Sequence, residues 1–187
     1  MAKSKNNIIT HGLSGIIGDM LVFSQRGGKT IVGKMHDTSH IVQTDKQKKI
    51  TLKFQEAVIY ARGALADPAI KAAYKGVAQP GHSAYNVAIA DFFNAPKIES
   101  INLSGYTGLA GQGIIVTATD DFDVKQVTVA IYNSDGSLVE KGDAIPNVNK
   151  SLWTYTTTAA NDHQHGDKIV VQASDIPGNL TESQQIL

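Results

Sequence analysis

The chain has 187 residues, of which 42% are hydrophobic and 18% charged, a composition that is typical of globular proteins and excludes a disordered chain. It contains no cysteine, which excludes a disulfide framework and thiol chemistry. No run approaches the ~20 apolar residues of a membrane span, and the N-terminus lacks an apolar segment of signal-peptide length. We therefore expect no membrane span, and synthesis in the cytoplasm without export through a signal peptide.

The charge is balanced over the whole chain but not along it. Residues 1–95 carry 12 basic and 6 acidic side chains, which gives +6, and residues 96–187 carry 5 and 11, which gives −6. This asymmetry favours two separate units. It fits ordinary solvated surfaces, and it also fits a basic end that meets nucleic acid or an acidic protein.

A β-hairpin is predicted near the N-terminus, where two β-prone runs at 20–23 and 30–35 flank Gly27 and Gly28. Paired glycines supply the positive φ angles that tight hairpin turns need.

A long helix is predicted over residues 45–66. Thr44 and Gln47 have the spacing of a capping box at its start. Apolar residues at helical spacing give this helix one apolar face: Ile50, Phe54, Ala57, Val58, Ala61, Ala64 and Leu65.

Two shorter helices are predicted to follow. Asp67 caps a helix over 69–78, and Ser83 caps another over 84–94. The second of these ends before Pro96, because the residue that precedes a proline disfavours the helical region.

After Pro96 the apolar period changes from about 3.6 residues to 2, which indicates strands. The alternation is clearest over 127–131, and the turn residues 133–136 end it. About seven short strands in about 90 residues are typical of an immunoglobulin-type β-sandwich. We expect Trp153 to fill the core of that sandwich.

The predicted fold class is therefore α+β. Residues 1–95 form a domain of one β-hairpin and about three helices, and residues 96–187 form an Ig-like antiparallel β-sandwich.

Several segments of the second half carry a family resemblance: Ala-Thr-Asp-Asp-Phe-Asp-Val at 118–124, Val-Thr-Val-Ala-Ile at 127–131, Asn-Ser-Asp-Gly at 133–136, and the segments 152–155, 166–171 and 173–179. With these segments, residues 97–185 resemble the bacterial Ig-like domains. The resemblance implies a sandwich without the antibody-type disulfide. It also implies a spacer, an adhesive module, or a contact with a cell-surface carbohydrate or receptor.

The first half is similar to small uncharacterised proteins of Bacteroidetes bacteria and their phages. The similarity lies in the Gly-spaced N-terminus before Leu21-Val22-Phe23, in Gly-Lys-Thr-Ile-Val at 28–32, and in the helix that contains Phe54. It points to a biological context and implies no chemistry.

Four acidic residues close two strands of the predicted sandwich: Asp120, Asp121, Asp123 and Asp175. If they converge at one pole, their carboxylate oxygens could bind Ca²⁺, although their spacing matches no EF-hand loop. His36 and His40 lie in a predicted loop without a third ligand, which favours solvated side chains. His163 and His165 lie in a predicted turn beside Asp162 and Asp167, where an adventitious metal site is the alternative to a solvated loop tip.

Five basic residues are candidates for contact with a neighbouring subunit or with phosphate: Arg26, Lys29, Lys46, Lys48 and Lys49. The first two flank the hairpin turn and the other three lie at the start of the long helix. A solvated surface is the ordinary interpretation, and phosphate contact is the alternative.

No nucleophile motif, phosphate loop or pair of catalytic carboxylates occurs in the chain, so we expect neither an enzyme nor a cofactor. Ig-like modules typically work outside a cell. A component of a virion or phage-like particle is released by lysis and therefore reaches the outside without an export signal.

The predicted function is a non-enzymatic structural component of such a particle, assembled with other virion proteins and as a homo-oligomer. Its first half anchors it and its sandwich faces outward for decoration or adhesion. The alternative is an intracellular protein that binds nucleic acid through its basic first half.

Overall fold

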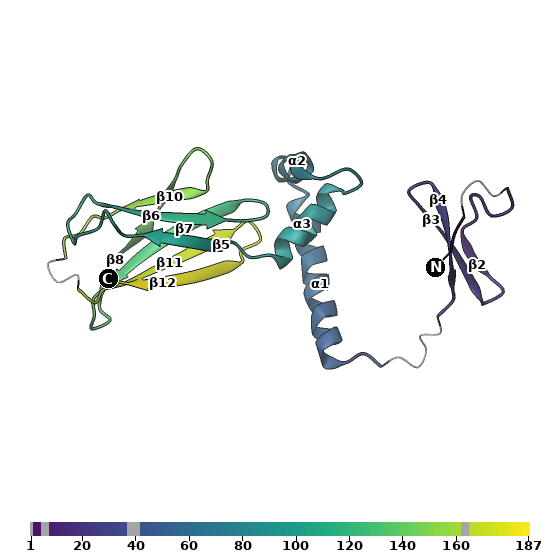
Figure 1. Ribbon diagram of the computed structural model, residues 1–187, viewed down its shortest axis with the longest axis horizontal. Helices are drawn as coiled ribbons and strands as arrows, with labels where there is room; N and C mark the ends of the chain where they lie inside the picture. Colours follow the sequence, from purple (N-terminus) through teal and green to yellow (C-terminus); the bar gives the residue numbers. More distant parts are fainter. Residues whose placement is uncertain (1, 5–7, 37–41, 162–164) are drawn as a thin grey trace. The chain divides into compact units, whose positions relative to one another are not determined.

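A computed structural model describes residues 2–4, 8–36, 42–161 and 165–187 (Figure 1). The contacts divide the chain into two compact units, Met1–Lys48 and Lys49–Leu187. The predicted α+β class is confirmed, with an N-terminal hairpin, three helices and then a β-sandwich. The division into units lies near the start of the first helix, whereas the sequence places a boundary at 95/96.

The first unit contains one antiparallel sheet. Its strands are β1 (Ala2–Ser4), β2 (Gly15–Ile17), β3 (Leu21–Arg26) and β4 (Lys29–Lys34), in the order β1-β4-β3-β2. The predicted hairpin is β3–β4, and its two turn residues, Gly27 and Gly28, have φ angles of 56° and 71°. These left-handed values are the ones a type I′ turn requires.

The three helices begin within one residue of the positions that the sequence predicts. They are α1 (Asp45–Ala64), α2 (Pro68–Val77) and α3 (Ala84–Phe93). Before α1, the backbone N–H of Gln47 donates to the Thr44 hydroxyl at 3.3 Å and the N–H of Thr44 donates to the Gln47 side chain at 2.9 Å, which completes the capping box.

Tyr74 is the centre of a small core that joins the helices to the sandwich. It is fully buried, as are Ala61 and Ala88 from α1 and α3. The ring of Phe122, from the β6–β7 turn of the sandwich, stacks on Tyr74 with ring centroids 4.2 Å apart. The C-terminal half of the apolar face predicted for α1 packs into this core. In its N-terminal half, Ile50 and Phe54 are 66% and 47% exposed.

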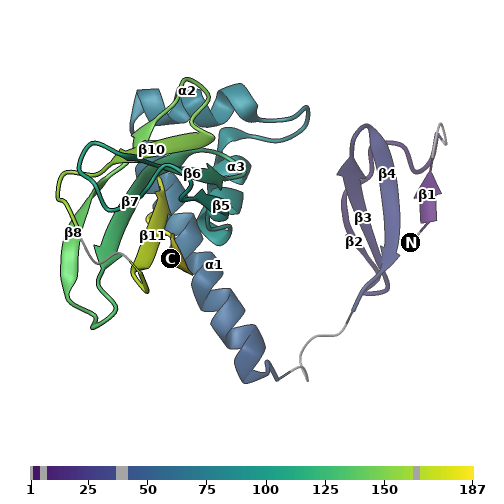
Figure 2. The same ribbon diagram turned by 60° about the vertical axis from the view of Figure 1, so that its left-hand side comes forward.

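The sandwich consists of two four-stranded antiparallel sheets (Figures 1 and 2). One has the order β5-β6-β10-β9 and the other β12-β11-β7-β8. The strand bounds are β5 (Lys97–Asn102), β6 (Gly113–Thr119), β7 (Val124–Tyr132), β8 (Leu138–Asp143), β9 (Ile145–Pro146), β10 (Leu152–Thr156), β11 (Lys168–Asp175) and β12 (Leu180–Ile186). This pairing is the A-B-E-D and G-F-C order of immunoglobulin-type folds, with β8 as an added edge strand.

The core of the sandwich is formed by the inward-facing residues of alternating strands. Along β11 every second residue is buried, from Ile169 to Asp175. Trp153 is 3% exposed within this core, as predicted, and its indole N–H donates to the main-chain oxygen of Lys150 at 3.0 Å. Within the described residues, no helix is long and apolar enough to cross a membrane.

Candidate functional site

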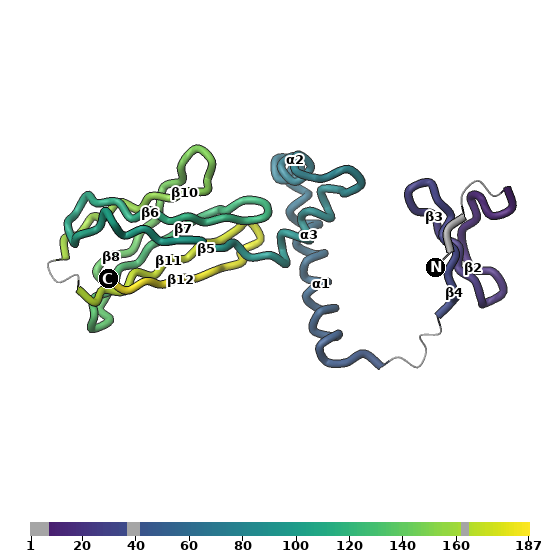
Figure 3. Tube along the Cα trace, viewed as in Figure 1, coloured from purple at the N-terminus to yellow at the C-terminus, as the bar shows by residue number. Residues whose placement is uncertain are grey.

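Asp175 ends β11 at the pole of the sandwich that faces the helices (Figure 3). The register between β11 and β7 shifts between Ser174 and Asp175, which marks a bulge at this end. Asp175 Oδ1 then accepts hydrogen bonds from the backbone N–H groups of Gly178 (2.8 Å) and Asn179 (2.6 Å). These two hydrogen bonds close a turn after β11 and fix the position of the Asp175 carboxylate.

Asp120 is held in a similar way at the end of β6. Its Oδ2 accepts from the backbone N–H groups of Phe122 at 3.2 Å and Asp123 at 3.1 Å. Each of these two turns therefore uses an aspartate side chain in place of further strand pairing.

Asp91 comes from the last turn of α3 and is only 1% exposed. Its Oδ2 accepts a hydrogen bond from the hydroxyl of Tyr74 at 2.5 Å, and the Tyr74 hydroxyl in turn lies 2.7 Å from that of Tyr60. Asp91 is thus positioned by the small core that joins the helices to the sandwich.

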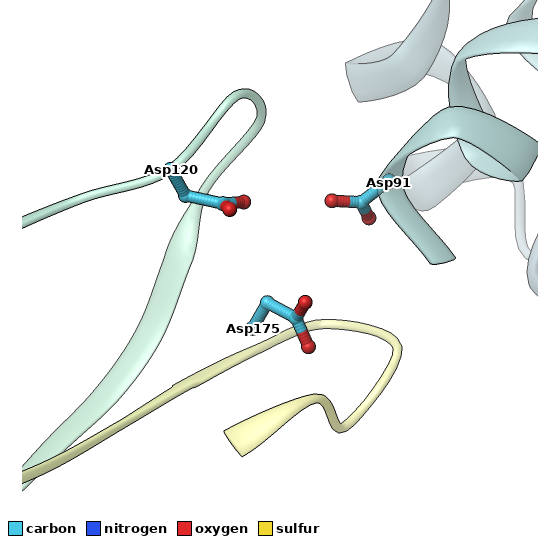
Figure 4. A group of neighbouring side chains, drawn as sticks. All are labelled: Asp91, Asp120 and Asp175. Atoms are coloured by element: carbon cyan, nitrogen blue, oxygen red, sulfur yellow. The ribbon is translucent and has the colours of Figure 1, made fainter. Parts of the chain in front are cut away.

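Asp91, Asp120 and Asp175 together form what we term the acidic junction (Figure 4). One carboxylate oxygen from each lies within 4.8 Å of the others, and Asp91 and Asp120 point toward one another. Asp91 Oδ1 and Asp120 Oδ1 are buried without a hydrogen-bond partner. At such a separation two carboxylates repel by roughly 3 kcal/mol, taking an effective dielectric constant of ~20.

The pKa values of the acidic junction reflect this crowding. Burial, with the nearby charges of Asp120, Asp175 and Asp121, raises the pKa of Asp91 to about 7, although the Tyr74 hydroxyl acts in the opposite direction. Burial also raises the pKa of Asp120, and Asp121 adds to the effect. Among the described residues no lysine or arginine forms an ion pair with the junction. A bound proton or cation would lower the repulsion within the junction.

The structure brings together two of the four acidic residues singled out in the sequence, Asp120 and Asp175. Asp121 instead accepts a hydrogen bond from the Asn94 side chain at 2.8 Å, and Asp123 pairs with the Lys150 ammonium at 2.6 Å. Asp91 is a member that the sequence reasoning missed. Its one signal was its position as the sole charged residue in the apolar segment of α3.

A cleft of about 560 Å³ adjoins the acidic junction at Asp120. It lies between the end of α3 and strands β5 and β6, and Asp120 forms part of its wall together with Glu99 and Asp121. Lys97 also lines the cleft, and three acidic side chains against one basic one favour the approach of cations over anions.

The five basic candidates are all exposed. Arg26 and Lys29 are directly paired across the β3–β4 turn. In the first turns of α1, the Lys48 ammonium lies 3.6 Å from the Asp45 carboxylate, and Lys46 and Lys49 lie beside it in sequence. Of the histidine pairs, His36 and His165 are exposed, and His40 and His163 lie outside the described residues.

The N-terminal sheet is a second candidate site because it is hardly covered. Among the described residues of the first unit only Phe23 and Thr30 are buried. Cross-strand partners share a face, and one face carries Ile17, Leu21, Phe23 and Val32. The opposite face carries Ile16, Val22 and Ile31. Both faces of this single sheet are therefore apolar.

No family model and no curated protein matches this chain. Among solved structures it is similar to CopC from Methylosinus trichosporium OB3b, with 14% identity and a TM-score of 0.37, over 49% of this chain and 89% of CopC. It is also similar to an engineered protein, with 17% identity and a TM-score of 0.33, over 59% of this chain and 28% of that protein. Likenesses at this level carry no argument about function.

Proposed function

We propose that this protein is a non-enzymatic structural subunit of a phage or phage-like particle, which assembles through its N-terminal sheet and presents its Ig-like sandwich outward. The observation that carries the proposal is the sheet with two apolar faces. Ile16, Ile17 and Met20 are 56%, 54% and 68% exposed in the single chain. A sheet needs a covered apolar face to be stable by itself, and among the described residues of this sheet only Phe23 and Thr30 are buried.

The partner that we propose for this sheet is a second copy of the chain. The first unit is small and contains no disulfide, so it needs association to become stable. The formal net charge of the chain is zero, and copies therefore do not repel one another overall. The exposed part of the α1 apolar face, at Ile50 and Phe54, offers further apolar surface for the same purpose.

The sandwich suits the displayed role because it needs no partner for its own stability. Its core contains fifteen buried residues from both sheets. A module of this kind can face outward and contact a cell-surface carbohydrate or receptor, or serve as decoration.

The mass of the purified protein tests the assembly. Light scattering after size exclusion is expected to give a homo-oligomer for the wild type and a monomer for the double variant Ile16→Asp, Leu21→Asp, which places a charge on each face. Ile145→Asp is the matched control, because Ile145 is 72% exposed on β9 of the sandwich, and it should leave the mass unchanged. A monomeric wild type, together with its absence from particles of its host in electron microscopy, overturns the proposal.

The alternative of a nucleic-acid-binding protein predicts a different result. It requires retention on DNA with a steep salt dependence, lost on neutralising Lys46, Lys48 and Lys49. The structural role predicts the same elution from DNA for the wild type and for this triple variant.

A further inference from the structure

We propose that Asp91, Asp120 and Asp175 bind a Ca²⁺ ion, which joins α3 to the pole of the sandwich. Three observations converge on this site. One oxygen from each carboxylate lies within 4.8 Å of the other two. Asp91 is 1% exposed and its Oδ1 has no hydrogen-bond partner, as is also true of Asp120 Oδ1. Figure 4 shows the Asp91 and Asp120 carboxylates pointing into the same space.

Each carboxylate is positioned by a donor from its own surroundings. The Tyr74 hydroxyl holds Asp91 through Oδ2, and backbone N–H groups hold Asp120 through Oδ2. Their other oxygens are the ones left without a partner. Metal ligands are commonly oriented by second hydrogen bonds of this kind. Asp175 accepts two backbone hydrogen bonds through Oδ1 and one from the Asn179 side-chain amide through Oδ2 at 2.7 Å, which leaves one lone pair of Oδ2 for a metal.

The ligand chemistry and the number of carboxylates favour Ca²⁺ among the common divalent ions. All three ligands are hard oxygens, without the nitrogen or sulfur that zinc prefers. Two oxygens on one ion are at most twice the ligand distance apart, which is about 4.6–5.2 Å for Ca²⁺ and about 4.0–4.2 Å for Mg²⁺. The separations of up to 4.8 Å in the acidic junction are compatible with Ca²⁺. A site of three protein carboxylates suits Ca²⁺ better than Mg²⁺, because Mg²⁺ usually keeps several waters and binds through one or two carboxylates. The cleft beside Asp120 is open to solvent and adjoins the site on that side.

The consequence is a cation-dependent link between two parts of one unit. Asp91 belongs to the helices, whereas Asp120 and Asp175 end strands of opposite sheets. Without a cation their charges repel, and with one they are drawn together. This inference is independent of self-association, because every ligand comes from the same chain.

Titration of the full-length, chelator-treated protein with CaCl₂ tests the proposal. Calorimetry should show one saturable site per chain. At a free Ca²⁺ concentration about 100 times Kd the melting temperature should rise by about 5–10 °C. Asp91→Asn and Asp120→Asn should each weaken binding by at least about 10-fold. Asp123→Asn is the control, because Asp123 pairs with Lys150 outside the junction, and it should bind as the wild type does.

Folding of the variants has its own readout. Replacing a carboxylate of the junction by an amide removes repulsion, so in chelator Asp91→Asn should melt no lower than the wild type. The absence of saturable binding by folded wild type at millimolar CaCl₂ overturns the proposal. Equal affinity for MgCl₂, or equal loss in Asp123→Asn, overturns it as well.

Discussion

The side-chain amide of Asn179 donates to the main-chain oxygen of Asn94 at 3.1 Å, and this contact ties the end of α3 to the β11–β12 turn. The same amide lies 3.2 Å from the main-chain oxygen of Phe92 and 2.7 Å from Asp175 Oδ2. One side chain of the sandwich therefore caps the last carbonyls of a helix that precedes it by 85 residues. This link explains why the helices belong to the same compact unit as the sandwich.

Removal of this amide should loosen the junction between helices and sandwich. Asn179→Ala leaves carbonyl oxygens of α3 without their donor, and we expect a loss of about 1–3 kcal/mol in the free energy of unfolding. Urea denaturation measures the loss, and hydrogen exchange should increase in the last turn of α3. Asn102→Ala is the matched control, because the Asn102 side chain accepts a hydrogen bond from the Ser104 N–H, a neighbour in sequence, at the surface. An equal loss in both variants contradicts the link.

A fragment of residues 42–187 should fold without the N-terminal sheet. Both hydrophobic cores lie within it, and it keeps the capping box at the start of α1. Its melting temperature should lie within a few degrees of that of the whole chain, followed by the fluorescence of Trp153, the sole tryptophan. A fragment that is unfolded at room temperature would show that the sheet supports the rest of the chain.

The elements with local signals were predicted well from the sequence. Thr44, Asp67 and Ser83 cap the three helices as expected, because caps depend on a few neighbouring residues. Strands β1, β2 and β9 have three, three and two residues, too few to show an alternating pattern, and they were not predicted. Likewise, the sequence shows an apolar face on α1 but not that Ile50 and Phe54 stay 66% and 47% exposed, the latter although its ring stacks on Phe93.

The acidic junction could be predicted only in part. Asp120 and Asp175 end strands in similar turns, so their convergence at one pole follows from the sandwich fold. Asp91 joins them only through the packing of α3, which places it far in sequence but close in space. Long-range packing of this kind leaves no periodic signal in the sequence.

Glu140 should make the sandwich sensitive to acid. Burial acts to raise its pKa, but hydrogen bonds from the Thr158 hydroxyl and N–H and from Ala159 N–H outweigh burial, so the pKa lies below its usual range. A depressed pKa stabilises the fold above the pKa of the unfolded state, about 4.3, and this stability is lost as pH falls through the folded value.

The variant Glu140→Gln tests that linkage. At pH 7 it should be less stable than the wild type by about 1–2 kcal/mol, because hydrogen bonds to a neutral acceptor are weaker. In urea denaturation from pH 7 to 3 the difference between the two proteins should shrink once the pH falls below about 4.3. A difference that stays constant over this range would rule out Glu140 as the source.

The hydroxyl of Tyr74 should contribute more to stability than that of its hydrogen-bonded neighbour Tyr60. Tyr74→Phe removes the donor to Asp91 Oδ2 and leaves a fully buried carboxylate without a protein partner, which should cost about 1.5–3 kcal/mol. Tyr60→Phe removes the hydrogen bond between the Tyr60 and Tyr74 hydroxyls, which joins two neutral groups. This change should lower the free energy of unfolding by about 0.5–1.5 kcal/mol. Thermal denaturation of both variants in chelator measures this difference in stability.

Tyr74→Phe should also bind Ca²⁺ about 10-fold more weakly than the wild type, since the Tyr74 hydroxyl orients the ligand Asp91. If the two variants lose equal stability, the Tyr74 hydroxyl does not hold Asp91 in place.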